Sequence, residues 1–182
     1  EHGERGLMIA VRETLPGLYA QHGFHMLDTG PVIVDDVGFA GVLGWYDYSL
    51  RDPALELGPR ESYETSRYAG HIVRNDKLFT RLGHSDPEFC AEQLALLDRQ
   101  LTDLSGRVER IVAVTHTVGL AEMIAHSAAT DEKRFERAYL GTAALAPLLA
   151  RHPKVTHHFC GHVHHFYRVR HAQFESVSIG IV

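Results

Sequence analysis

The chain has 182 residues, of which 45% are hydrophobic and 23% are charged, and these proportions exclude intrinsic disorder and a small disulfide-stabilised scaffold. The 18 basic and 23 acidic residues give a formal net charge of −5, and no run of Lys or Arg forms the basic surface that a nucleic-acid-binding protein needs. The apolar runs are far shorter than the roughly 20 residues that span a bilayer, so we expect neither a nucleic-acid nor a membrane partner.

One helix and three strands are predicted in the first 45 residues. Residues 4–21 carry apolar side chains at three- and four-residue spacing, which predicts an amphipathic helix, perturbed at Pro16, that packs on a sheet. Three short apolar runs separated by turn-forming residues are expected to be strands. They cover residues 24–27, 31–34 and 39–45.

The middle of the chain predicts a long loop followed by a well-defined helix. Residues 46–83 lack a clear period, and we expect an irregular excursion with one short helix. Ser85 then supplies an N-cap, Pro87 suits the first turn, and Glu88 completes a capping box. An apolar stripe follows, so the predicted helix begins after Ser85 and ends at Gly106.

The remaining elements predict an α/β domain. Residues 110–116 form a continuous apolar run with a polar end, which is typical of a central strand covered on both faces. Thr142 is expected to cap a short helix, and residues 155–179 are expected to form short strands. Within the first of these, alternation lets only one of His157 and His158 face inward, and we interpret both as packing or surface residues.

Cysteine and histidine usage indicates the compartment and a type of site. Cys90 and Cys160 lie far apart in the sequence, so we expect no disulfide framework, and the cytoplasm is the predicted location. The chain has 14 histidines, many of them near the C-terminus. Since neutral imidazole is the commonest metal ligand in proteins, this bias indicates a metal site.

Two histidine features are the best candidates for that site. Residues 159–165, FCGHVHH, follow a predicted strand. Joint binding by His162 and His164 needs a turn in which both rings face inward, and Gly161 permits such a turn. His116 ends the apolar strand, where packing does not require a histidine. Alone, each feature is more typical of a surface loop or a strand-end histidine with ordinary partners.

Together, a strand ending in His116 and a later strand leading into Gly161, His162 and His164 resemble the calcineurin-like metallophosphoesterases. The resemblance implies an α/β fold, a two-sheet β-sandwich flanked by helices, with two metal ions at the carboxyl ends of its strands. It implies that His116 and His162 bind one metal and that His164 binds the other. Residues 44–49, GWYDYS, are also similar to a segment in a bacterial branch of the family.

The family's earlier motifs, Asp-x-His, Gly-Asp-x-x-Asp and Gly-Asn-His followed by Asp or Glu, do not occur in this sequence. In the family a helix follows the third motif, and here residues 1–3 run directly into a predicted helix. We therefore expect residues 1–182 to be a single metallophosphoesterase-like domain that is incomplete at the N-terminus and lacks its first strands. No residue matches the family's catalytic histidine, so catalytic and substrate-binding residues are not assigned.

The implied activity is metal-dependent hydrolysis of a phosphomonoester or phosphodiester, in which two cations activate water for in-line attack. Imidazole ligands favour Mn, Fe, Ni, Co or Zn over Mg or Ca. Two other functions stay open. One is a noncatalytic metal-binding or interaction domain that keeps the fold with an incomplete site. The other is a mononuclear zinc hydrolase that uses His116, His162 and His164. We expect this 182-residue chain alone to be a weak catalyst.

Overall fold

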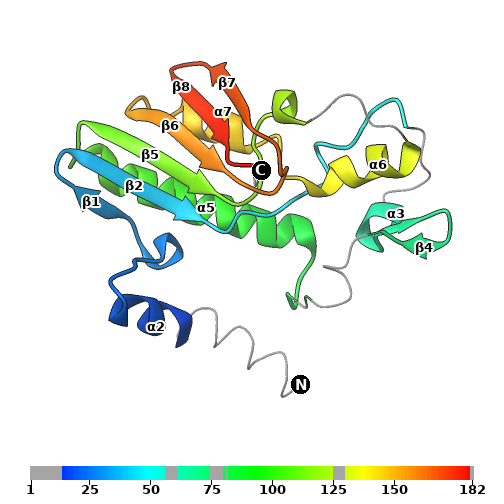
Figure 1. Ribbon diagram of the computed structural model, residues 1–182, viewed down its shortest axis with the longest axis horizontal. Helices are drawn as coiled ribbons and strands as arrows, with labels where there is room; N and C mark the ends of the chain where they lie inside the picture. The colour runs from blue at the N-terminus through cyan, green and yellow to red at the C-terminus, as the bar shows by residue number, and fades with distance from the viewer. Residues whose placement is uncertain (1–13, 56–60, 74–79, 81, 125–129, 181–182) are drawn as a thin grey trace.

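A six-stranded mixed sheet forms the centre of the protein in the computed structural model, which describes residues 14–55, 61–73, 80, 82–124 and 130–180 (Figure 1). The strand order is β1-β2-β5-β6-β8-β7. The four inner strands run parallel, and β1 and β7 are antiparallel edges. The strands are β1 (Val32–Val34), β2 (Val37–Val42), β5 (Arg110–Thr115), β6 (Val155–Cys160), β7 (Tyr167–His171) and β8 (Phe174–Ser178).

Two helices cover one face of this sheet, α5 (Asp86–Ser105) and α7 (Leu145–Ala150) (Figure 1). Burial therefore alternates along β5: Ile111 and Ala113 are buried, whereas Val112 and Val114 are only half-buried. β5 is central, as predicted, but the expected cover on both of its faces is not found among the described residues. Its apolar run reflects a strand whose side chains are buried on one face and partly solvent-exposed on the other.

The helix α5 confirms the clearest prediction from the sequence. Glu88 N donates to the Ser85 side chain at 3.4 Å, and the Glu88 carboxylate accepts from Ser85 N at 2.9 Å. Asp86, buried in the first turn, accepts hydrogen bonds from Trp45 Nε1 and from the hydroxyl of Tyr48. Burial and this carboxylate raise the pKa of Tyr48 far above its usual value. The helix start thus holds the segment that follows β2.

A second layer of small elements lies beyond one end of the sheet. The long loop contains the predicted short helix, α3 (Glu61–Glu64), and also a two-stranded sheet that the sequence did not indicate, β3 (Arg67–Tyr68) with β4 (His71–Ile72). The helix α6 (Asp131–Glu136) and a 3-10 turn (Arg137–Tyr139) lie near this region (Figure 1). An α/β fold with two sheets flanked by helices is therefore confirmed, although the second sheet is small.

The N-terminal segment differs most from expectation. Its described helix, α2 (Leu15–Gln21), has no buried residue, and Leu18 is 48% exposed, so this part of the predicted helix does not pack on the sheet as expected. Residues 24–27 do not form a strand but lead into the 3-10 turn η2 (Leu27–Thr29). Residues 4–13 of the predicted helix lie outside the described residues.

The start of α7 also differs from the prediction, because Ala144 rather than Thr142 occupies the N-cap position. The Thr142 hydroxyl instead accepts from Ala144 N at 3.1 Å and donates to Asp47 Oδ2 at 2.8 Å. Thr142 therefore joins the helix start to the loop after β2. Among the described helices, none combines the length and apolar character needed to cross a bilayer.

A chain of hydrogen-bonded polar side chains, called here the buried polar chain, crosses the helix-covered face of the sheet. At its centre is His158, which is 0% exposed. Its Nε2 lies 2.9 Å from Thr115 Oγ1 on β5, and its Nδ1 lies 2.8 Å from Ser176 Oγ on β8. The neighbouring His157 is exposed, so alternation along β6 turns one histidine inward, as expected. Burial lowers the pKa of His158 to about 4, and the ring is neutral in the folded protein near pH 7.

We expect the free energy of unfolding to fall as the pH is lowered from about 6.5 to about 4. In this window an unfolded imidazole takes up a proton while the buried His158 does not, because its folded pKa is about 4. The unfolded chain then binds more protons, and stability that is fully present above the unfolded pKa is lost. The shift corresponds to about 3 kcal/mol. Urea unfolding at several pH values measures it.

The non-titrating variant His158→Leu should lose this part of the pH dependence, whatever its stability at neutral pH. The variant His157→Leu is the matched control, because it removes an exposed histidine from the same strand. Its pH dependence should equal that of the unchanged protein. Identical slopes for His158→Leu and the unchanged protein would show that His158 does not contribute in this way.

Candidate metal centre

Parallel strand ends bring the two predicted ligand segments together. β5 and β6 are neighbours, with Thr115 opposite Cys160 in the register. Directly beyond this pair, Gly161 N donates to His116 O at 3.0 Å, and His116 N donates to Leu43 O at 3.0 Å. The ends of β2, β5 and β6 are thus joined by backbone hydrogen bonds, and His116 lies between the other two.

The imidazoles of His116 and His162 meet at this edge. His116 Nε2 lies 3.1 Å from His162 Nδ1, and the ring centroids are 4.8 Å apart. His162 Nε2 lies 3.2 Å from the carbonyl oxygen of Tyr139. A carbonyl only accepts, so His162 Nε2 carries the proton and Nδ1 turns its lone pair toward His116. Metal-binding histidines commonly have their second nitrogen held in this way.

The separation of these two nitrogens fits a shared metal ion. Two imidazole nitrogens at about 2.0–2.1 Å from a zinc ion, at a tetrahedral angle, lie roughly 3.3 Å apart. The distance of 3.1 Å between His116 Nε2 and His162 Nδ1 is close to that value. The donor set is imidazole nitrogen, which suits a transition metal rather than Mg or Ca.

Gly161 has a different role from the one expected. The left-handed residues of the turn are His162, with φ of 68°, and His164, with φ of 50°, and Gly161 is not among the residues with positive φ. The glycine matters because it has no side chain: a Cβ at position 161 would lie 3.3 Å from His116 Nδ1. The glycine lets the His116 ring lie directly against the backbone that follows β6.

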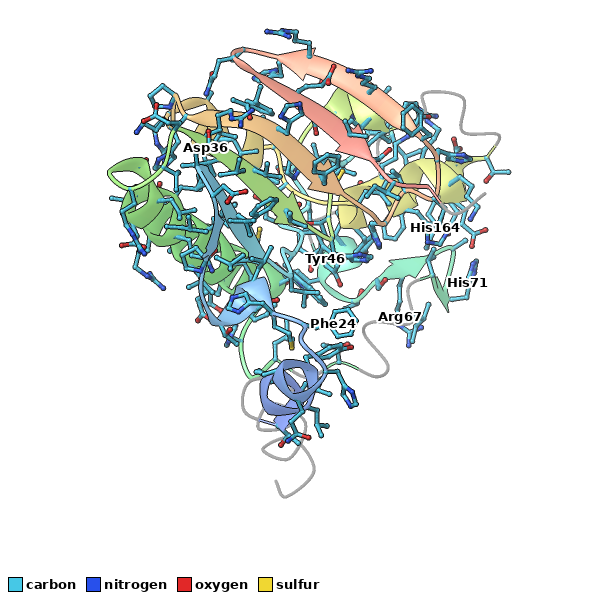
Figure 2. The ribbon with its side chains drawn as sticks, turned by 60° about the vertical axis from the view of Figure 1, so that its left-hand side comes forward. Phe24, Asp36, Tyr46, Arg67, His71 and His164 are labelled. Atoms are coloured by element: carbon cyan, nitrogen blue, oxygen red, sulfur yellow. The ribbon has the colours of Figure 1, made fainter. Side chains whose placement is uncertain are left out.

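His164 does not join the pair. It is exposed and lies in the connection between β6 and β7 (Figure 2). Within the described residues, no three His, Cys, Asp or Glu side chains come together in an arrangement that holds a metal ion. The structure thus brings together His116 and His162 of the three predicted ligands, and the metal-binding roles of all three remain predictions.

A cavity of about 440 Å³ opens beside His116, at the carboxyl ends of β2, β5 and β6. Asp28 and His25 from the segment around η2 line it together with His116 and Gly161. Asp28 Oδ1 accepts from Leu43 N at 2.8 Å, which fixes its carboxylate at the cavity wall. Sequence reasoning did not single out Asp28, because nothing in the local pattern separates it from an ordinary turn residue.

The Tyr139 carbonyl is held by a cluster of aromatic side chains. Tyr139 is 0% exposed, and its hydroxyl donates to Tyr63 O at 2.8 Å. Tyr46, which lies at the centre of the view in Figure 2, meets its ring edge-on at 5.2 Å. Sequence analysis could not find Tyr139, because it contributes a backbone oxygen. The GWYDYS segment supplies Tyr46 and Tyr48, both buried in this cluster.

The two cysteines are free and buried. Burial raises the pKa of the Cys160 thiol to about 12 and that of Cys90 to about 12. Cys160 immediately precedes the candidate centre, but its thiol is protonated near neutral pH. It acts as a small apolar residue there, and not as a nucleophile.

Comparison with known proteins gives a likeness in fold. Neither a protein-family model nor a curated protein matches the chain. A solved structure, phosphopantetheinyl hydrolase from Mycobacterium tuberculosis, matches with a TM-score of 0.70 and 16% identity over 92% of this chain and 60% of that one. A dimetal phosphatase from Danio rerio gives a TM-score of 0.45 at 16% identity, over 80% of this chain and 46% of that one. The chain therefore shares an α/β fold with the mycobacterial hydrolase and spans 60% of the length of that protein.

Proposed function

We propose that this protein is a metal-dependent phosphoester hydrolase whose catalytic centre includes His116 and His162. The observation that carries the proposal is the 3.1 Å approach of His116 Nε2 to His162 Nδ1 at the carboxyl ends of adjacent parallel strands. Ligands of layered α/β folds bind at such strand ends. The likeness in fold to a hydrolase adds support.

The residues have separate roles in this proposal. His162 presents the lone pair of Nδ1 because the Tyr139 carbonyl holds its other nitrogen. His116 would supply a second nitrogen ligand to the same ion. His164 would serve a second ion. A pair of divalent transition-metal ions, chosen from Mn, Fe, Ni, Co and Zn, would supply an activated water and neutralise phosphoryl charge during in-line attack. The cavity of about 440 Å³ gives a phosphomonoester or phosphodiester access to this edge.

The first test measures metal content and hydrolysis together. We expect His162→Ala and His116→Ala each to lose one bound transition-metal ion, and His164→Ala to lose the other. Each should remove most of whatever hydrolysis of p-nitrophenyl phosphate or its bis-ester the chain performs, because both ions act on one displacement. Metal content by atomic emission and initial rates check this. Phosphopantetheine belongs in the substrate panel, because the mycobacterial fold neighbour is named for that group.

The matched control for these variants is His157→Ala, which removes an exposed histidine from the strand that leads to the centre. Its metal content and rate should equal those of the unchanged protein. One zinc per chain with retained hydrolysis would favour the mononuclear zinc hydrolase. Bound metal without hydrolysis of any ester would favour the noncatalytic domain. Unchanged metal content in both His116→Ala and His162→Ala would reject the site.

A second prediction concerns the space beside His116. Gly161→Ala places a methyl group 3.3 Å from His116 Nδ1, which is closer than most real contacts, so the ring must shift by a few tenths of an ångström. We expect metal affinity to fall by about ten-fold, as for changes that misplace a ligand. Isothermal titration with zinc measures this affinity.

Gly106→Ala is the control for this change, because a Cβ there meets no atom within 4 Å and its φ is −88°. Both glycines lie at the end of a regular element and neither has a positive φ. Equal zinc affinities for Gly161→Ala and Gly106→Ala would mean that the His116 ring does not need its place against Gly161.

A further inference from the structure

We propose that His158 is a positioning residue for His116, acting through Thr115. The metal-binding consequence rests on the proposed function, whereas the hydrogen-bond arrangement does not. His158 lies on β6 beneath the candidate centre, and its ring bridges β5 and β8. Thr115, its partner on β5, directly precedes His116, so the effect of His158 passes through Thr115 to the turn that carries His116.

The available protons fix the direction of the hydrogen bonds that link His158, Thr115 and Thr117. Thr115 Oγ1 lies 2.6 Å from Thr117 O and 2.9 Å from His158 Nε2. The carbonyl of Thr117 only accepts, so the single hydroxyl proton of Thr115 points to it. His158 Nε2 must then carry a proton and donate to Thr115. The chain of donors therefore runs from His158 through Thr115 to the backbone of Thr117.

The other side of the ring agrees with this tautomer. His158 is neutral in the folded protein because burial disfavours its charged form, so Nδ1 has no proton and accepts from Ser176 Oγ at 2.8 Å. The Ser176 hydroxyl also lies 3.2 Å from Met123 Sδ. A thioether is a weak acceptor, so the serine proton favours the imidazole nitrogen.

The end of this chain encloses His116. The hydrogen bond from Thr115 to Thr117 O spans the residue between them, and the main chain of His116 is also held by Leu43 O and Gly161 N. These contacts set the direction in which the imidazole leaves β5. A hydrogen-bond donor at position 158 leaves the Thr115 hydroxyl free to donate to Thr117 O. An acceptor at position 158 would compete with Thr117 O for the same hydroxyl proton.

Packing alone does not account for an imidazole at this position. The side chain is 0% exposed on the helix-covered face of the sheet, where an aliphatic residue fills space without the loss of imidazole hydration. Replacement by leucine would leave Thr115 Oγ1 buried and without its incoming donor. The hydrogen-bonded ring thus supplies orientation that an apolar residue cannot.

The first measurement needs no metal ion. In the protein with ¹⁵N-labelled histidine, we expect NMR at neutral pH to show His158 as the Nε2–H tautomer. We also expect His158→Leu to shift the ring nitrogens of His116, and Val155→Ala, a cavity-forming change at a buried position of the same strand, to leave them unchanged. An Nδ1–H tautomer, or His116 signals that do not move in His158→Leu, would overturn the proposal.

The second measurement is zinc affinity by isothermal titration. His158→Leu and Thr115→Val should each weaken binding by about ten-fold, and their effects should not add, because both break the same chain. His158→Gln, whose amide can donate to Thr115 and accept from Ser176, should restore most of the affinity. Equal affinities for His158→Leu and Val155→Ala would overturn the proposal.

The two measurements separate this proposal from the proposed function. If neither the unchanged protein nor any variant binds zinc, Mn, Fe, Ni or Co, the metal-dependent function is wrong, and the NMR shifts alone then decide the positioning role. If zinc binds and His116→Ala abolishes binding while His158→Leu does not weaken it, the function stands and the positioning role is rejected.

Discussion

Parallel pairing of β5 with β6 places the ends of both strands at one edge of the sheet, and the candidate centre depends on its register. With Thr115 opposite Cys160, the residues that follow each strand are His116 and the Gly161–His162 turn. A slip of one residue would move one strand by about 3.3 Å and turn its side chains to the other face. It would separate the two imidazoles and expel His158 from the core. One register therefore satisfies both the surface pair and the buried polar chain.

The two imidazoles of the pair are held by different kinds of packing. His162 depends on the Tyr139 carbonyl, which belongs to the aromatic cluster beyond the sheet. His116 depends on backbone hydrogen bonds between strand ends and on the polar chain beneath them. Cluster and sheet meet at the loop after β2, where Trp45 and Tyr48 hydrogen-bond to Asp86 at the start of α5. Loss of that anchor would change the position of one imidazole relative to the other.

Local signals in the sequence predicted the elements whose cause is local. The capping box at Ser85 predicted the start of α5, and the apolar run at 110–116 predicted β5 and the strand-end position of His116. The tertiary contacts were not predictable in the same way. The helix α2 has an apolar stripe but no buried residue among those described, and the contribution of Tyr139 is a backbone oxygen that any residue carries. The left-handed φ values fall on His162 and His164, although glycine is the residue that the pattern offers for a turn.

The two imidazoles are already in contact with each other. His116 Nε2 lies 3.1 Å from His162 Nδ1, within hydrogen-bond distance, and the tautomer of His162 is set by the Tyr139 carbonyl outside the pair. Under the proposed function, binding a cation there would not require the ordering of a loop, which usually subtracts from affinity. A left-handed φ at His162 is uncommon for a residue other than glycine. The contacts of its ring with the Tyr139 carbonyl and with His116 hold the side chain in place in this conformation, so the aromatic cluster and the strand ends together define the turn.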